Sequence, residues 1–462
     1  MNRFRSNFIG DRAFYSRMAA VVLPMIIQNT LTNIVSLLDN VMVGRIGTLP
    51  MSAVAIINQL FFVYYICIFG GTSGAGIYTA QFYGNGDNDG IRYSMRVKLI
   101  ISVTATLAAL AIFLAGGTYL AGLYIAEGTQ AAARLETLGY ARSYMLIMLI
   151  GLIPFSLTQC YSGTLRETGH TTIPMIASMA AMGINFIFNL LLIFGLLGFP
   201  RLGIVGAAIA TIISRFAELG IVAVFSHSNA EGLPFMQGIF THFHIPAALL
   251  RDILKKAAPL FINELLWSFG ETVLLQLYST RGIDVVAAMN INNTVAQVFN
   301  EIFLSLGAAA GILAGQELGA GKLDKAKQTA WRMTFASTLA CAAVGLMLAL
   351  VSSVIPSIYN TEPEIRRLAS ILLLVSALVM PLRGMTNVAY FTLRSGGQTL
   401  VTMAFDSCFS CVVVIPTAIF IAYFTGLNIV WFYFFCTMLE LIKAVIGVIF
   451  LKRGTWLNRI VA

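Results

Sequence analysis

Charged residues are scarce in this sequence. They make up only 11% of its 462 residues, whereas an ordinary soluble domain has about 25%. Hydrophobic residues account for 58% of the chain, which is more than the core of a soluble protein could bury. The composition therefore excludes an ordinary soluble protein and indicates a chain that lies mostly in a membrane.

The sequence also lacks the motifs of several functional classes. Its six cysteines all lie in apolar stretches without the spacing of a metal site, and we interpret them as packing residues. It contains no His-Glu-x-x-His, Gly-x-Ser-x-Gly or paired-aspartate signature, so we expect neither an enzyme nor a cofactor. The net charge of +9 comes from residues scattered through short loops, which argues against a nucleic-acid partner.

Long apolar runs fill most of the chain. Each is about 18 residues or more, enough for a helix to cross roughly 30 Å of hydrocarbon. The runs are continuous rather than alternating, which indicates helices and not a β-barrel. We therefore predict an all-α polytopic membrane protein with twelve transmembrane helices. They lie near residues 17–43, 51–82, 95–118, 136–160, 172–196, 203–226, 256–279, 285–316, 328–351, 366–391, 399–422 and 427–450.

Basic residues favour one orientation of these spans. With both termini in the cytoplasm, the cytoplasmic segments contain 19 Lys and Arg residues and the external segments contain 6. Such an excess is typical of cytoplasmic loops. The longest connection, 227–252, then lies in the cytoplasm, and there we expect a linker with an interfacial helix.

The chain repeats itself internally. A shift of 235 residues places Pro24 on Pro259, and a shift of 228 residues places 164–171 on 392–399 with Thr, Leu, Arg, Gly and Thr in common. The first shift also matches Gln81, Gly84 and Gly86 with Gln316, Gly319 and Gly321. Six spans per half make the two halves parallel repeats, which in transporters form two lobes around a midplane site. We therefore predict an N-terminal lobe (1–226), a linker (227–252) and a C-terminal lobe (253–462), and a transport function.

Several strings resemble those of one transporter family. They are Leu-Asp-Asn-Val-Met-Val-Gly at 38–44, Ala-Gln-Phe-Tyr-Gly-Asn-Gly-Asp at 80–87, Asn-Phe-Ile-Phe-Asn at 185–189, Gly-Ala-Ala-Ile-Ala-Thr at 206–211 and the paired Thr-Leu-Arg segments. In their order along the chain and in their occurrence in both halves, these strings resemble the sequences of the prokaryotic multidrug and toxic compound extrusion (MATE) family. The resemblance covers nearly the whole chain.

This resemblance implies a V-shaped exporter of two six-helix lobes in a bacterial or archaeal cytoplasmic membrane. Such a protein expels amphipathic, often cationic small molecules in exchange for protons or sodium ions, and we expect it to act as a monomer in the lipid bilayer. The superfamily also contains lipid-linked oligosaccharide flippases, and flipping of such a lipid is the alternative function. A flippase would need a row of cations for pyrophosphate, but the spans hold mainly acids.

Polar residues recur on one face of the first span at three-to-four-residue spacing, which is helical. They include Asn29, Asn33, Ser36 and Asp39, and we expect this face to line the cleft. An ionisable group inside a span costs roughly 2.5–3.5 kcal/mol and needs a partner or a wet cavity. By resemblance, Asp39 is the essential carboxylate, with Asn185, Asn189, the Ala207 carbonyl and Thr211 as its partners. Some relatives have Asp in place of Asn189, so sodium binding here is in doubt.

The second half has its own ionisable residues. The polar stripe of the first span becomes acidic, with Glu264 and Glu271, and the eighth span presents Asn293, Gln297 and Glu301. Arg383 lies within a span and needs a counter-ion, for which Glu264, Glu271 or Asp406 could serve. We leave two interpretations open for these acids, a structural pair with Arg383 or a second coupling site.

Overall fold

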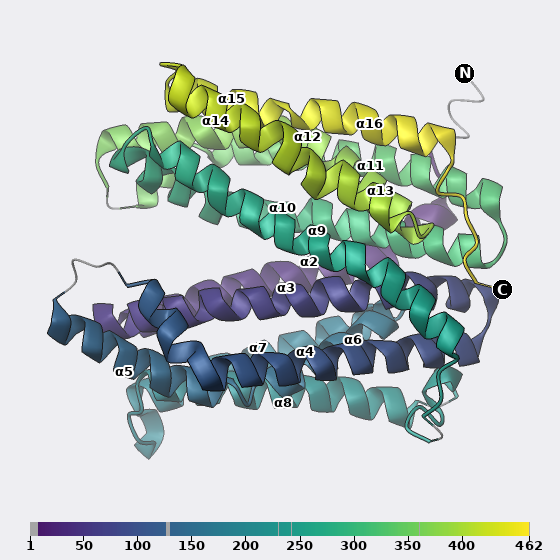
Figure 1. The fold of residues 1–462 in the computed structure, drawn as a ribbon, viewed down its shortest axis with the longest axis horizontal. Coiled ribbons are helices and arrows are strands. Elements are labelled where there is room, and N and C mark those ends of the chain that lie inside the picture. Colours follow the sequence, from purple (N-terminus) through teal and green to yellow (C-terminus); the bar gives the residue numbers. More distant parts are fainter. Residues whose placement is uncertain (1–7, 126–129, 230, 242, 360, 462) are drawn as a thin grey trace. The chain divides into compact units, whose positions relative to one another are not determined.

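The computed structural model describes residues 8–125, 130–229, 231–241, 243–359 and 361–461 (Figure 1). These residues form helices joined by short loops and contain no β-strand. The first half contains α2 (Arg12–Gly44), α3 (Thr48–Asn85), α4 (Asn88–Leu123), α5 (Ala131–Met148), α6 (Leu152–Glu167), α7 (Thr172–Phe194) and α8 (Ile204–Ser228).

The second half contains α9 (Ala247–Ser279), α10 (Ile283–Gly319), α11 (Leu323–Val351), α12 (Pro363–Ser395), α13 (Thr399–Met403), α14 (Ile415–Phe424), α15 (Ile429–Met438) and α16 (Glu440–Arg453). Between α13 and α14 lie two π-helical stretches, η4 (Ala404–Cys408) and η5 (Ser410–Val414).

Each predicted span corresponds to helix in the structure. In the described part of the chain, ten helical spans are long and apolar enough to cross a membrane, and the pair α5 and α6, bent by 47°, makes an eleventh if it is one span. Helix α9 has 33 residues, also enough to cross, although its charged and polar side chains make it less apolar. The prediction of an all-helical polytopic membrane protein is confirmed.

The chain divides into two compact units. Unit 1 comprises Met1–Ile26, Ala80–Asp87 and Lys255–Ala462, and unit 2 comprises Ile27–Thr79 and Asn88–Leu254. Two segments of the first half therefore belong with the second half, the start of α2 and the end of α3. The reason is packing, because Val21, Val22 and Met25 lie in one apolar cluster with buried residues of α9, α10, α11 and α12.

The matched residues of the repeat meet each other inside unit 1. A Cβ atom on Gly84 would lie 1.8 Å from the carbonyl oxygen of Gln316, and one on Gly319 would lie 1.8 Å from the carbonyl oxygen of Gln81. The two contacts are reciprocal, and the shift of 235 residues relates one to the other. Small residues allow membrane helices to approach this closely. The sequence repeat is therefore also a two-fold related crossing of α3 and α10.

The linker is held to unit 2 by Arg96 of α4. The guanidinium donates to the carbonyl oxygens of Ile239 (2.9 Å), His244 (2.8 Å), Gly238 (2.8 Å) and Thr241 (2.9 Å). In a regular helix these four carbonyls would point along the axis toward the next turn and could not converge on one side chain. The prediction of an interfacial helix in 227–252 is wrong for the described residues. Between α8 and α9 they contain only the 3-10 turn η2 (Pro234–Met236), while residues 230 and 242 lie outside the description.

Candidate functional site

The predicted partners of Asp39 surround it in unit 2. Asn185 and Asn189 lie one turn apart on α7, and both are buried. Asn189 Nδ2 donates to Asp39 Oδ1 at 2.7 Å and to Asn185 Oδ1 at 3.0 Å. From α8, Thr211 Oγ1 donates to the Ala207 carbonyl at 3.0 Å and accepts from Asn185 Nδ2 at 3.4 Å. The structure thus brings all five residues into one connected network.

The Asn185 amide has two incompatible neighbours when Asp39 is ionised. Its oxygen position lies 3.0 Å from Asp39 Oδ1, 3.2 Å from Asp39 Oδ2 and 3.0 Å from Asn189 Nδ2. An oxygen there faces a carboxylate, and rotating the amide places a nitrogen beside the Asn189 nitrogen. A proton on Asp39 Oδ2 removes the conflict, because the hydroxyl then donates to Asn185 Oδ1. The neutral acid therefore resolves the conflict at Asn185, while the buried Asn189 Oδ1 has no hydrogen-bond partner among the described residues.

The other polar residues expected to line a cavity are more accessible. On α2, Asn29 and Asn33 are half-buried and Ser36 is exposed, and on α10 both Asn293 and Gln297 are exposed. They belong to different units, and each remains a predicted cavity-lining residue.

The C-terminal acids have a different partner from the expected one. Asp406 Oδ1 forms an ion pair with Lys443 of α16, and Asn263 Nδ2 donates to Asp406 Oδ2 at 3.1 Å. Among the described residues, Arg383 has no carboxylate within 4.0 Å, and its Nη1 donates to Asn300 Oδ1 at 3.4 Å. Asp406 therefore pairs with Lys443 rather than with Arg383, because it lies on a π-helical turn that packs against α16, while Arg383 acts on Glu271 from beyond ion-pair distance.

The other acids of this half differ in their surroundings. Tyr390 donates to Glu264 Oε1 at 3.4 Å and accepts from Asn263 Nδ2 at 3.2 Å. Glu271 is exposed and Glu301 is half-buried. Sequence reasoning missed the parts played by Asn263, Tyr390 and Lys443. The signal for Lys443 was present, because an intramembrane cation needs an acidic partner.

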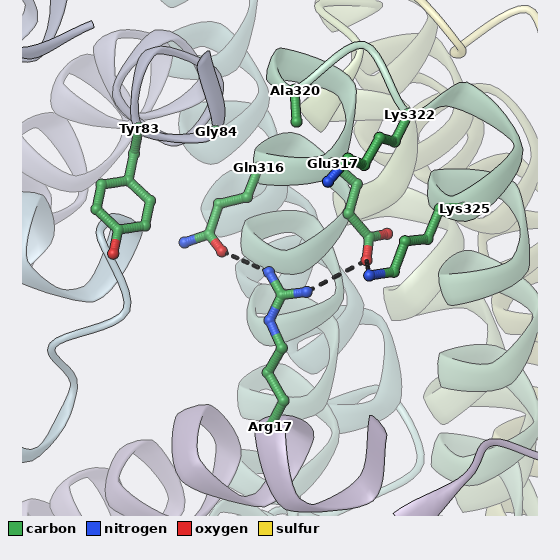
Figure 2. Close-up of a pocket in the computed structure, with 8 residues that line it drawn as sticks. All are labelled: Arg17, Tyr83, Gly84, Gln316, Glu317, Ala320, Lys322 and Lys325. Atoms are coloured by element: carbon green, nitrogen blue, oxygen red, sulfur yellow. Dashed lines mark hydrogen bonds and ion pairs between the residues drawn. The ribbon is translucent and has the colours of Figure 1, made fainter. Parts of the chain in front are cut away.

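A pocket of about 300 Å³ lies in unit 1, at the ends of α3 and α10. Figure 2 shows the Arg17 guanidinium of α2 reaching into it between Gln316 and Glu317. Its Nη2 donates to Gln316 Oε1 at 2.9 Å, and its Nη1 lies 3.3 Å from Glu317 Oε1. Glu317 is buried, so Arg17 neutralises a charge at the glycine crossing.

We expect Arg17→Met to destabilise the protein by about 1–3 kcal/mol, because it leaves the buried Glu317 without its nearest cation. Arg17→Met combined with Glu317→Gln should recover most of this loss. Thermal unfolding of the single and double variants measures the coupling. Arg45→Met, on an exposed turn after α2, is the matched control, and additive losses in the double variant would contradict the pairing.

Comparison with known proteins places the chain in a family. A family model described as MatE matches residues 24–191 and 259–420, one segment in each half. The "Probable multidrug resistance protein YoeA" of Bacillus subtilis is 26% identical over 420 residues, covering 90% of this chain and 89% of that protein. A "Probable multidrug resistance protein NorM" of Thermotoga maritima is 24% identical over 445 residues, covering 96% and 93%.

Solved structures agree on the fold. The "Crystal structure of MATE in the straight conformation" matches with a TM-score of 0.85 at 18% identity, covering 96% of each chain. The "Outward-facing conformation of a multidrug resistance MATE family transporter of the MOP superfamily" matches with a TM-score of 0.84 at 19% identity, again over 96% of each chain. The family resemblance and the predicted fold are both confirmed, and the chain belongs to the MATE family of membrane transporters rather than to any class of enzyme.

Proposed function

We propose that this protein is a proton-driven antiporter that exports amphipathic, cationic small molecules by alternating access, with Asp39 as the proton carrier. The observation that carries the proposal is the close contact between the Asp39 carboxyl and the Asn185 oxygen, which becomes a hydrogen bond when the carboxyl holds a proton. Release of that proton leaves Asn185 Oδ1 facing a carboxylate, so the two protonation states favour different arrangements of α2 and α7. A change of this kind is what couples a proton to a conformational step.

Sodium is the second candidate for the coupling ion. Asn185, Asn189, Thr211 and the Ala207 carbonyl supply hard oxygens. However, Asn189 directs its Nδ2 at Asp39 Oδ1, and an amide donor at that oxygen occupies a position a cation would need. The geometry therefore favours the proton.

The charges support a cationic substrate over a phosphorylated lipid. In the described residues, Lys98, Lys443 and Arg17 each pair with a carboxylate, from Glu167, Asp406 and Glu317 respectively. Cations neutralised in this way do not form the row that a lipid-linked pyrophosphate requires, which disfavours the flippase. The relatives named as multidrug resistance proteins support the substrate class. We place the protein in a bacterial or archaeal cytoplasmic membrane with both termini in the cytoplasm, on the distribution of basic residues. We further propose that it acts as a monomer, as the family resemblance implies.

Everted membrane vesicles test this function. We expect ethidium or norfloxacin to be taken up when a pH gradient, acidic inside, is imposed, and not when a sodium gradient is imposed at equal pH. Vesicles from cells without the protein give the background. Uptake driven by sodium alone would show that sodium, and not the proton, is the coupling ion. No uptake of any amphipathic cation would favour the flippase.

A further inference from the structure

The Asp406–Lys443 pair lies within unit 1 and has no part in the Asp39 network. Lys443 also lies over the Phe405 ring, with Nζ 5.7 Å from the ring centre. The side chains of Asp406 and Lys443 retain 20% and 13% of their accessible surface. The pair is therefore desolvated but can still be reached. A buried ion pair offers little net stability over apolar residues of similar size, so its presence needs another explanation.

One oxygen of Asp406 is held by a rigid partner. Asn263 is 1% exposed and makes three contacts besides Asp406 Oδ2, two to Ser407 of η4 and one to Tyr390 of α12. Its Oδ1 accepts from the Ser407 amide at 3.3 Å, its carbonyl accepts from Ser407 Oγ at 2.7 Å, and its Nδ2 donates to Tyr390 Oη at 3.2 Å. The carboxylate is thus fixed in place on a π-helical turn, a feature frequent at functional sites.

The other oxygen is held by a partner that can move. Lysine carries a compact charge on a flexible four-carbon stem. Three residues earlier on α16, Glu440 is a second acidic neighbour of Lys443, and Glu271 of α9 is a third. Glu440 lies at the i,i+3 distance that allows side-chain pairing on a helix. Lys443 can therefore leave Asp406 without losing all acidic partners.

Other charges balance this group of acids. Arg383 and Arg394 of α12 act on the same cluster, and Glu264 adds a further negative charge beside Asp406. Counting Lys443, three cations face Asp406, Glu264, Glu271 and Glu440, four acids. Among these acids in the described residues, Asp406 forms a direct ion pair with one of the cations, so it is the position at which an incoming cation would compete.

We propose that Asp406 binds the cationic group of the exported compound and that Lys443 is a tethered counter-ion, which this compound displaces toward Glu440. The proposal rests on the proposed function for its substrate class, but it concerns a site separate from Asp39. The lysine keeps Asp406 paired while no substrate is bound. It also competes with the substrate, which lowers affinity and aids release.

Equilibrium binding to the purified full-length protein in detergent tests the proposal. The probe is tetraphenylphosphonium, a cation without a titratable proton, and triphenylphosphine oxide is the neutral comparison. We expect Lys443→Met to tighten tetraphenylphosphonium binding roughly 5-fold or more, the usual size of coupling between competing ligands. Neutral-ligand binding should stay unchanged. Lys452→Met, an exposed lysine near the end of the same helix, should leave both unchanged.

The charge-balanced double variant, Asp406→Asn with Lys443→Met, decides between substrate binding and structural pairing even if Lys443→Met folds poorly. We expect this variant to unfold at the wild-type temperature. Its affinity for the cation should fall roughly 5-fold or more. Wild-type cation affinity in this variant would show that the pair is only structural and would overturn the proposal. Failure of the wild-type protein to bind the cation at all would instead contradict the proposed function.

Discussion

Asp39→Asn is expected to reduce pH-driven efflux to the background of vesicles without the protein, while expression and thermal stability stay near the wild type. An amide replaces the carboxyl with almost the same shape, and its oxygen can still accept from Asn189 Nδ2, now 2.7 Å from Asp39 Oδ1. It cannot take up or release a proton, so no proton can be exchanged for substrate at this position. Everted vesicles at matched expression measure the effect.

The control for this change is Asp11→Asn. Asp11 is exposed and caps the start of α2 by accepting from the Phe14 amide at 2.9 Å. The amide can keep that bond, so this variant should transport normally. Efflux by Asp39→Asn at the wild-type rate would exclude Asp39 as the proton carrier, and aggregation of the variant would indicate a structural role.

Gly84→Ala is expected to cause a large loss of stability, about 3 kcal/mol or more. The new methyl group would lie 1.8 Å from a backbone oxygen, that of Gln316. A backbone atom cannot rotate away as a side chain does, so the ends of α3 and α10 must separate. The folded yield after extraction in detergent and the temperature of unfolding measure the loss.

The reciprocal contact at Gly319 gives a second test of the same prediction. Gly319→Ala meets the Gln81 carbonyl at the same 1.8 Å and should be as damaging as Gly84→Ala. Gly116→Ala, within α4, has no atom within 4 Å of the new methyl group and should be neutral or slightly stabilising, because alanine favours helix over glycine. A stable Gly84→Ala protein would show that the crossing is not tight.

The sequence alone determined the parts of the structure that depend on local properties. Helix length and apolar content follow from bilayer thickness, so the spans could be located from their composition. The repeat predicted two related halves, and the spacing of Asn185 and Asn189 placed them on one face of α7. Asp39 could be joined to them only through the family resemblance, because α2 and α7 are 150 residues apart at the Asp39–Asn189 bond.

Tertiary structure alone decided the details that depend on contacts between distant segments. The start of α2 packs with the second half because Val22 and Met25 find their apolar neighbours there. Between α8 and α9 the described residues contain no α-helix, because four of their carbonyls converge on Arg96. Asp406 pairs with Lys443 rather than Arg383, and the π-helical turn is the reason. Each residue that a π-helix adds to a turn rotates the following side chains by about 100°, which helical periodicity read from the sequence cannot anticipate.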